Sequence, residues 1–234
     1  YCTIPMARGK SRSPKIDKVL DHIWKLEDAN INEIILSGIN VGDFGQGNNE
    51  SFIELLDKIN EKTSIPRIRI SSIEPNLITD EIIDLIASSN KFMPHLHIPL
   101  QSGSSRILRK MKRRYNIETY INKINSIKSQ IQDCTIGVDI MTGFPGESEK
   151  DFSDTYDLLS ALPISYLHVF PFSERENTIA YSMKNKVSLD VRYARAKILR
   201  KLSNIKFQEI QRNSINQSRS VLFELSEDGF LSGL

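Results

Sequence analysis

The feature that most constrains the fold of this chain is a regular alternation between short apolar segments and amphipathic segments. Five segments rich in Ile, Val or Leu predict β-strands, at residues 33–37, 67–72, 95–99, 135–141 and 166–171. A polar or glycine-containing loop follows each strand, and apolar residues at helical spacing come after most of these loops. Strand–helix alternation at this spacing predicts a parallel sheet with helices outside it.

The predicted helices begin at recognisable capping residues. Ser13 followed by Pro14 predicts an N-cap and a first helical residue. A capping box at residues 51–54 precedes the apolar positions of the second helix. The later helices are predicted to begin at Thr79, Ser104 and Ser148.

The pattern changes after residue 187. A long charged helix is predicted from about residue 190 to residue 213, with one apolar stripe formed by Ala194, Ile198, Leu199, Leu202 and Ile205. Residues 220–224 then predict the first strand of a small β-module. We therefore divide the chain into an α/β core at 1–187, a helical connection at 188–219 and the start of a β-module at 220–234.

Six strand–helix units are expected in the core, because the loop at Cys2 should follow a further strand that the chain does not contain. Six units form either a doubly wound sheet or a partial barrel, and both folds place their sites at the carboxyl ends of the strands. The loops at these ends begin near residues 2, 37, 71, 99, 142 and 171, and all are small, polar or rich in glycine. Six such loops at one end of a sheet predict a ligand-binding rim.

Several common sites are excluded or disfavoured. The sequence has no P-loop, no dinucleotide fingerprint and no nucleophile elbow. His95 and His97 are spaced for a shared metal, but without a third ligand nearby we interpret them as packed strand histidines. Two distant cysteines form no disulfide framework, and we interpret Cys134, at the start of a strand, as a structural thiol.

The charge is distributed unevenly along the chain. The net charge is only +2, but a block without acidic residues contains Arg106, Arg109, Lys110, Lys112, Arg113 and Arg114. Such a block suits a phosphate backbone, although a solvated helix face is the simpler interpretation of charge alone. No apolar run approaches the roughly 20 residues that cross a bilayer, and no secretory signal is visible. We expect a cytoplasmic protein with no membrane contact.

The loops, in this order, resemble those of the radical S-adenosylmethionine methylthiotransferase family. The resemblance is carried by YCTIPMARGKSRS at residues 1–13, RISSIEP at 69–75, HLHIPLQSG at 95–103, GFPGE at 143–147 and HVFPFSER at 168–175. The segments CTIPMARG and RISSIEP are most similar in sequence to those of family members that act on N6-threonylcarbamoyladenosine beside the tRNA anticodon. VLFE at residues 221–224 resembles the opening of the RNA-binding TRAM barrel.

The resemblance implies a partial (β/α)6 TIM-like barrel of the radical SAM type, followed by a long helix and the start of a small β-barrel. It implies a 4Fe-4S cluster on Cys2 and two cysteines upstream of the chain, and a second cluster in an N-terminal domain that the chain lacks. S-adenosylmethionine, tRNA and an electron donor such as flavodoxin or ferredoxin are the implied partners. With one of three cluster cysteines, the isolated chain is expected to be inactive.

The resemblance also assigns residues to roles. The expected contacts to S-adenosylmethionine come from Ser37, Gly38, Glu74, Gln101, Ser102, Asp139, Ser173 and Arg175. The expected contacts to RNA phosphates come from Arg8, Arg106, Arg109, Lys110, Arg113 and Arg114. For Asp139, a structural carboxylate is an equally good interpretation.

Other functions stay open on the sequence alone. The same chemistry can act on isopentenyladenosine or on a ribosomal-protein aspartate. A catalytically dead RNA-binding remnant keeps the basic block without the chemistry. A barrel hydrolase or aldolase with Glu74 or Asp139 as general base is a further alternative, but it gives no reason for the segment around Cys2.

Overall fold

Five parallel strands form the centre of the molecule. The computed structural model describes residues 2–225 and 231–233. The strands are β1 (Glu33–Leu36), β2 (Arg67–Ile70), β3 (His95–His97), β4 (Thr135–Thr142) and β5 (Tyr166–Pro171). β1 pairs with β2, and β3, β4 and β5 pair in that order, all in parallel. Parallel bridges from Ile68 to Phe92 and from Ser72 to His97 connect β2 to the β3 segment. All five predicted strands are confirmed, with ends that differ by at most two residues from the prediction.

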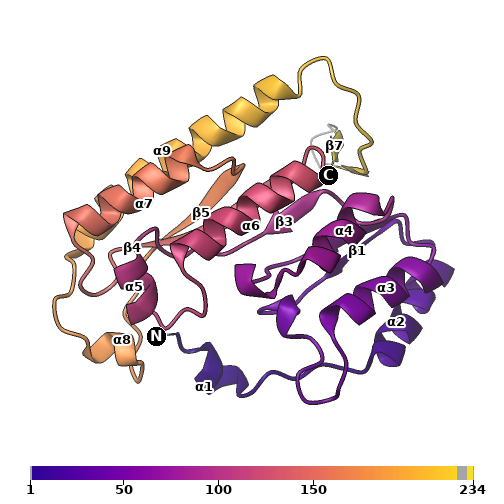
Figure 1. Ribbon diagram of the computed structural model, residues 1–234, viewed down its shortest axis with the longest axis horizontal. Coiled ribbons are helices and arrows are strands. Elements are labelled where there is room, and N and C mark those ends of the chain that lie inside the picture. The colour runs from indigo at the N-terminus through magenta and orange to yellow at the C-terminus, as the bar shows by residue number, and fades with distance from the viewer. Residues whose placement is uncertain (1, 226–230, 234) are drawn as a thin grey trace.

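Helices follow the strands as the alternation predicts (Figure 1). Short helical turns, η1 (Val41–Asp43) and η2 (Pro75–Leu77), lie in the loops after β1 and β2. The α-helices are α1 (Ile4–Arg8), α2 (Ile16–Asp28), α3 (Phe52–Lys62), α4 (Asp80–Ser88), α5 (Ser105–Lys110), α6 (Ile117–Gln130), α7 (Glu149–Ala161), α8 (Ile179–Ser182) and α9 (Leu189–Asn213). The order of elements is that of an α/β core followed by one long helix.

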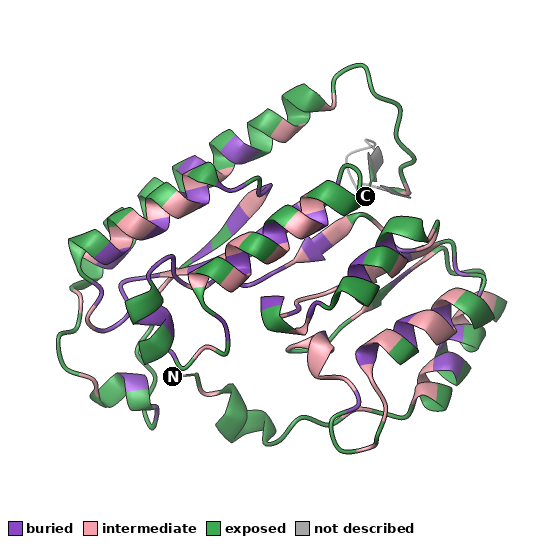
Figure 2. Ribbon diagram, in the orientation of Figure 1, coloured by how far each residue is buried: buried purple, intermediate pink, exposed green. Residues whose placement is uncertain are grey.

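The core lies between the strands and the helices. Alternate strand residues, such as Ile34, Ile68, Leu96 and Leu167, are buried on the helix side. Figure 2 shows the same alternation along the strands and on the inward stripes of the helices. Burying one such side chain contributes about 1.5–3 kcal/mol. The opposite face of the sheet is partly open, and it is therefore the face that can receive a ligand.

The helix starts follow the predicted caps with one exception. Ser51 and Ser148 form complete capping boxes, and Thr79 and Ser104 cap α4 and α5. The predicted start at Ser13 and Pro14 is wrong, because α2 begins at Ile16. The backbone N–H of Ile16 donates to the Glu50 carboxylate at 3.1 and 3.2 Å. Ser13 Oγ instead accepts a hydrogen bond from Gly45 N at 3.2 Å, so the start of α2 is stabilised by a residue distant in sequence.

α9 is one residue longer than predicted, but its buried face differs from the predicted stripe. Leu199 and Leu202 are buried as expected, whereas Ala194, Ile198 and Ile205 are exposed. The buried face is completed by Arg192, Arg195, Ala196 and Lys206. The charged ends of these side chains bind groups on the core: Arg192 donates to Phe172 O and Lys206 to Ser160 O. A hydropathy pattern misses positions where a long cationic side chain is buried with its charge satisfied.

The C-terminal residues include two short antiparallel strands, β6 (Phe223–Leu225) and β7 (Leu231–Gly233). The strand predicted at residues 220–224 begins three residues later than expected, and residues 226–230 lie outside the described part. Within the described ranges, no helix is long and apolar enough to cross a membrane.

Candidate functional site

The open face of the sheet carries a set of mostly polar side chains that point away from the helices. We call it the inner face, and it consists of Glu33, Ile35, Arg67, Arg69, His95, His97, Asp139, Met141, Tyr166, His168 and Phe170. The strand registers place these residues in layers, because Gly137 pairs with Tyr166, Asp139 with His168 and Met141 with Phe170. A side chain at Gly137 would collide with the Tyr166 ring, which occupies that space. The layers run from the amino ends of the strands to their carboxyl ends.

In the layer at the amino ends of the strands, the polar side chains bind one another. Arg67 Nε lies 2.8 Å from the Glu33 carboxylate, and Arg69 Nη1 lies 3.4 Å from it. His95 Nε2 and Tyr166 Oη lie 2.8 Å apart. Burial and the nearby charge of Arg69 lower the pKa of His95 to about 4, so the ring is neutral near pH 7. Because these side chains already bind one another, we do not expect this layer to bind a ligand, and we call it the floor of the inner face.

The middle layer contains a chain of three hydrogen-bonded side chains. Ser72 Oγ lies 2.7 Å from His97 Nδ1, and His97 Nε2 lies 2.8 Å from Asp139 Oδ1. The His168 ring, which is exposed, meets the edge of the His97 ring with centroids 5.3 Å apart. The packed-histidine interpretation holds for His95 and His97 in that each ring has a polar partner on the inner face. Among the described residues, no three His, Cys, Asp or Glu side chains are grouped to hold a metal ion.

The loop after β1 brings Ser37 and Gly38 to an exposed position beside the N-terminal segment. Gly38 N donates to Ser71 Oγ at 3.3 Å, which connects the loops after β1 and β2. A cavity of about 1200 Å³ is lined by residues from Arg8 to Pro14, by α2 and by the loop that contains Ser37 and Gly38. The segment that follows Cys2 therefore lies against the predicted ligand-binding loop.

Glu74 is engaged by two arginines of the basic block. Arg113 Nη1 lies 2.8 Å from Glu74 Oε1, and Arg114 Nη2 lies 3.6 Å from Glu74 Oε2. Arg114 also lies 3.4 Å from the Asp43 carboxylate. Glu74 N donates to Asn40 Oδ1 at 3.1 Å. The predicted cofactor contact at Glu74 and two predicted RNA contacts are thus brought together in one ion-pair network across three loops.

Gln101 and Ser102 follow β3 but differ in exposure. Gln101 is partly buried and adopts a positive φ of 70°, which is uncommon for a residue other than glycine. Its backbone is held by hydrogen bonds from Gln101 N to Asp139 O and from Met141 N to Gln101 O. Ser102 is buried, and its Oγ accepts from Ser104 N at 3.1 Å. The structure therefore brings Gln101 to Asp139, and it places Ser102 within the packed loop.

The loop after β5 carries Ser173 and Arg175, which are both exposed. Between them, Glu174 forms an ion pair with Arg192 of α9 at 2.9 Å and with Lys186 at 2.7 Å. These ion pairs hold the loop to α9. Ser173 also lines a cavity of about 380 Å³ between β5 and α9.

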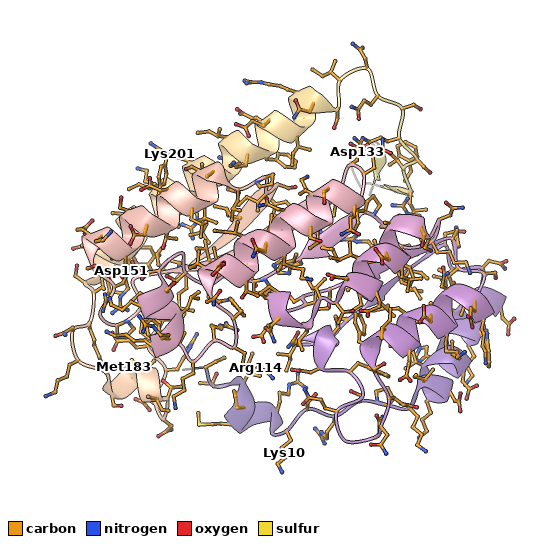
Figure 3. The ribbon with its side chains drawn as sticks, viewed as in Figure 1. Lys10, Arg114, Asp133, Asp151, Met183 and Lys201 are labelled. Atoms are coloured by element: carbon orange, nitrogen blue, oxygen red, sulfur yellow. The ribbon has the colours of Figure 1, made fainter. Side chains whose placement is uncertain are left out.

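The remaining basic residues fall into two groups. Arg106 forms an ion pair with Asp151 and donates to Gly146 O at 2.6 Å, so it joins α5 to α7. Burial would raise the pKa of Asp151, but hydrogen bonds from Arg106, Ser104 and Ser148 outweigh it and lower that pKa. Arg8, Arg109 and Lys110 are exposed and form no ion pair with any described residue. Figure 3 shows Asp151 beside α5 and Arg114 on the same side of the molecule as α1 and Lys10.

The two cysteines have contrasting environments. Cys2 is exposed, and its Sγ accepts a hydrogen bond from Ile4 N at 3.4 Å. Cys134 is buried just before β4, away from the carboxyl-end loops, as expected of a structural thiol. Burial raises the pKa of Cys134 to about 12.

Sequence reasoning missed Ser72, His97 and His168 as parts of the site. The alternation of β3 and β5 could have identified both histidines, because they share the strand face that carries Asp139. Ser72 lies beyond the end of β2, and only the bridge to His97 turns it toward the inner face.

Known proteins are similar to this chain in sequence and in fold. The Threonylcarbamoyladenosine tRNA methylthiotransferase MtaB of Bacillus subtilis (strain 168) is 39% identical over 206 residues, which are 87% of this chain and 46% of that protein. MtaB of Aquifex aeolicus is 36% identical over 96% of this chain and 55% of its own length. The tRNA-2-methylthio-N(6)-dimethylallyladenosine synthase of Clostridium tetani is 39% identical over 87% of this chain and 46% of that protein. The chain spans about half the length of the curated relatives it matches.

The solved structures confirm the fold class. Coproporphyrinogen III oxidase (HemN) from Escherichia coli, a radical SAM enzyme, superposes with a TM-score of 0.61 at 15% identity, over 82% of this chain and 46% of that chain. The model of the Radical SAM superfamily matches residues 1–159, which include every strand of the core except β5. The chain belongs to the radical SAM superfamily.

Proposed function

We propose that this chain is the catalytic part of a tRNA methylthiotransferase that modifies the C2 position of N6-threonylcarbamoyladenosine beside the anticodon. The observation that carries the proposal is the 39% identity to the Bacillus subtilis MtaB over 87% of this chain. The N-terminal segment and the loop after β2 support the threonylcarbamoyl substrate among the methylthiotransferases, because their sequences resemble most those of the enzymes that act on it.

The second candidate substrate is an adenosine with an isopentenyl-type group. The Clostridium tetani relative, which is named as a dimethylallyladenosine synthase, is as similar in identity as the Bacillus subtilis enzyme. The reaction is the same in both cases, so the inner face serves either substrate. A ribosomal-protein aspartate remains the outcome to test if neither nucleoside is modified.

The residues present fit the cofactors of the superfamily, a 4Fe-4S cluster and S-adenosylmethionine. Cys2 offers an exposed thiol with a backbone N–H directed at its sulfur, which suits a thiolate that ligates iron. The cavity beside Ser37 and Gly38 adjoins the segment that follows Cys2. When bound, the cluster and S-adenosylmethionine supply the radical chemistry and the methyl group. We propose two further ligating cysteines upstream of Cys2 and a second cluster in an N-terminal domain.

The residues of this chain bind and orient the cofactor. Ser37 and Gly38 are proposed to meet its amino acid part, because they are exposed at the rim next to the Cys2 segment. Asp139, Gln101 and Glu74 are proposed to position its polar groups from the inner face and the β2 and β3 loops. Ser173 and Arg175 lie at the rim after β5, where Arg175 is exposed and can bind a carboxylate with two hydrogen bonds. Ser102 contributes through the packing of its loop, since its hydroxyl is buried.

The RNA-binding residues are proposed to lie on the rim beside α1 and α5. Arg8, Arg109 and Lys110 are the direct phosphate contacts, because they are exposed and form no ion pair within the described part. Arg106, Arg113 and Arg114 hold this surface in place through Asp151, Glu74 and Asp43. We propose that residues 1–187 form the catalytic core, 188–219 connect it, and 220–234 begin a TRAM-like module. The reaction is proposed to take place in the cytoplasm, with flavodoxin or ferredoxin as electron donor.

The experiment that tests this proposal is mass spectrometry of tRNA nucleosides from a strain that lacks the gene. We expect the 2-methylthio derivative of N6-threonylcarbamoyladenosine to disappear and the unthiolated nucleoside to accumulate. A copy of the full-length gene should restore the product, and a copy with Cys2→Ala should not. If the methylthiolated isopentenyl-type nucleoside disappears instead, the isopentenyl-type adenosine is the substrate. An unchanged nucleoside profile would refute tRNA modification.

A further inference from the structure

Arg114 is an exposed arginine whose guanidinium is held in one place. Its Nη2 lies 3.4 Å from the Asp43 carboxylate and 3.6 Å from Glu74 Oε2. Glu74 Oε2 is buried and accepts no hydrogen bond from a described residue, so its charge attracts the Arg114 guanidinium. The Arg114 side chain is nevertheless 58% exposed, whereas those of Asp43 and Glu74 are 15% and 13% exposed. The two acids therefore orient Arg114 from the protein side and leave its other side open to a ligand.

The backbone on both sides of Arg114 is also fixed. Lys112 has a positive φ of 55° at the end of α5, and the N–H of Arg113 donates to Leu108 O at 3.0 Å, as in a helix C-cap. The next residue, Tyr115, is buried, and its Oη donates to Pro99 O at 2.9 Å. Because the segment is already ordered, a ligand that binds Arg114 does not have to order it.

The Arg114 guanidinium keeps donors that the protein does not use. Both acids contact the same nitrogen, Nη2, and neither Nε nor Nη1 donates to a described residue. A guanidinium has five N–H donors in a planar fork that matches the two oxygens of a carboxylate. The charges of Asp43 and Glu74 are balanced by Arg113 and Arg114, and Lys112 is adjacent in the chain. An added anion therefore does not meet a negatively charged cluster.

Arg114 lies at the margin of the cavity that is proposed to hold the cofactor. Its partner Asp43 lines this cavity of about 1200 Å³ together with the loop that contains Ser37 and Gly38. Figure 3 shows Arg114 on the same side of the molecule as α1 and Lys10. In adenine, C2 and C6 are both bonded to N1, so a substituent on N6 lies beside the carbon that the proposed reaction modifies. We therefore expect the N6 substituent to reach the loops around this cavity.

We propose that Arg114 binds the carboxylate of the threonylcarbamoyl group and thereby selects this nucleoside over one with an isopentenyl-type group. The inference rests on the proposed function and names a residue that determines its substrate. An isopentenyl-type group has no charge and no hydrogen-bonding atoms. It would remove water from the Arg114 guanidinium without replacing the lost hydrogen bonds, so the same contact disfavours the second candidate substrate.

The test measures the affinity of full-length protein, under anaerobic conditions, for three anticodon stem-loop RNAs. One carries N6-threonylcarbamoyladenosine, one carries the same nucleoside with its carboxylate replaced by an amide, and one carries isopentenyladenosine. We expect the wild type to bind the carboxylate roughly 10- to 100-fold more tightly than the amide, because a charge-assisted pair is lost. Arg114→Gln should bind the two equally, and Arg114→Lys, which keeps the charge without the fork, should show an intermediate preference.

A matched control separates a carboxylate contact from a phosphate contact. Arg109→Gln, which changes an exposed arginine of α5, should weaken all three stem-loops by the same factor. Arg114→Gln should keep its affinity for S-adenosylmethionine and its thermal unfolding temperature. The comparison of carboxylate with amide uses the wild type alone, so it tests the proposal even if a variant unfolds.

Three results would overturn the proposal while leaving the proposed function intact. The wild type shows no preference for the carboxylate over the amide, Arg114→Gln keeps that preference, or Arg114→Gln weakens all stem-loops alike. Weakened binding of S-adenosylmethionine by Arg114→Gln would also overturn it, because Arg114 would then serve the cofactor. A wild-type protein that binds none of the stem-loops, or that prefers isopentenyladenosine, would refute the proposed function together with this inference.

Discussion

Cys2 and Cys134 show how strongly the surroundings determine the reactivity of a side chain. Cys2 is exposed near the rim, whereas Cys134 is buried at the opposite ends of the strands with its pKa raised to about 12. Only the thiolate reacts with alkylating reagents, so a buried thiol with a raised pKa is protected twice. This contrast separates the proposed cluster ligand from the structural thiol.

The expected result is selective alkylation of Cys2 by iodoacetamide at pH 8 in metal-free protein, with Cys134 unmodified until the chain is unfolded in urea. Peptide mass spectrometry measures both sites in the same sample. The pKa of Cys134 is raised from 9.0, so burial of its neutral thiol favours the folded state below pH 9, and this contribution is lost as the pH rises toward 12. Equal labelling rates at the two cysteines in folded protein would contradict the assignment.

Asp151 is a second residue whose environment predicts a measurable effect. Its carboxylate caps α7 through Ser148 and binds Arg106, so Asp151→Ala should lower the free energy of unfolding by about 2–4 kcal/mol. Asp154→Ala is the matched control on the same helix, because its exposed pair with Lys150 contributes at most about 1 kcal/mol. Urea denaturation measures both variants.

The pH dependence of the Asp151 contribution follows from the lowered pKa. A carboxyl whose folded pKa is lowered stabilises the fold above its unfolded pKa, for which the ordinary value is 3.8. The difference between the wild type and Asp151→Ala should therefore be constant from pH 8 to pH 5 and shrink as the pH falls below 4. A difference that grows in acid would show that Asp151 is not held as a carboxylate.

At the scale of elements, α9 shows where sequence patterns succeed and where they fail. Its existence and length follow from the sequence, but only two of the five predicted stripe residues are buried. The reason is that Arg192, Arg195 and Lys206 occupy buried positions, since core carbonyls and carboxylates bind their charges. The Arg195–Glu147 pair at 2.6 Å connects α9 to the loop after β4.

The neighbouring residues Leu199 and Ile198 provide a direct test of the buried face of α9. Leu199 is fully buried, whereas Ile198 is 43% exposed. We expect Leu199→Ala to lower the free energy of unfolding by about 2–5 kcal/mol and Ile198→Ala by less than about 1 kcal/mol. Denaturant melts of the two variants check the orientation of the helix, and comparable losses would show that the observed face is wrong.

The other elements show which local signals are sufficient. All five strands and four predicted helix caps are recovered, because alternation and capping chemistry act within a few residues. The start of α2 was mispredicted because Glu50, which is 34 residues away from Ile16, accepts its N–H. The Ser72–His97–Asp139 chain was missed for the same reason, since it joins three different strand segments through tertiary packing. Contacts between distant residues are not encoded in any local period.

At the scale of the whole molecule, the parallel sheet gathers residues that are far apart in sequence onto one face. Side-chain pairs close the inner face at the amino ends of the strands, and the helices cover the opposite face of the sheet. A ligand therefore reaches the inner face from the carboxyl-end loops. The N-terminal segment with Cys2 lies against the first of these loops, and the β5 loop is held by α9 at the other end of the sheet. The fold thus places the N-terminal segment beside the loop that contains Ser37 and Gly38.

This arrangement predicts that Cys2 is necessary for cofactor loading. After anaerobic reconstitution of the full-length protein, Cys2→Ala should contain about four fewer iron atoms per chain than the wild type, because one cluster loses a thiolate ligand. Cys134→Ala is the matched control and should keep the full iron content. An unchanged iron content in Cys2→Ala would place the cluster elsewhere.

The most direct test of the central claim is the reaction itself. Full-length protein, reconstituted with iron and sulfide and supplied with S-adenosylmethionine and a reductant, is incubated with tRNA from the deletion strain, and the nucleosides are quantified by mass spectrometry. The account predicts 2-methylthio-N6-threonylcarbamoyladenosine from the wild type, none from Cys2→Ala and a reduced amount from Asp139→Asn. No methylthiolated nucleoside from the wild type, or equal product from Cys2→Ala, would contradict it.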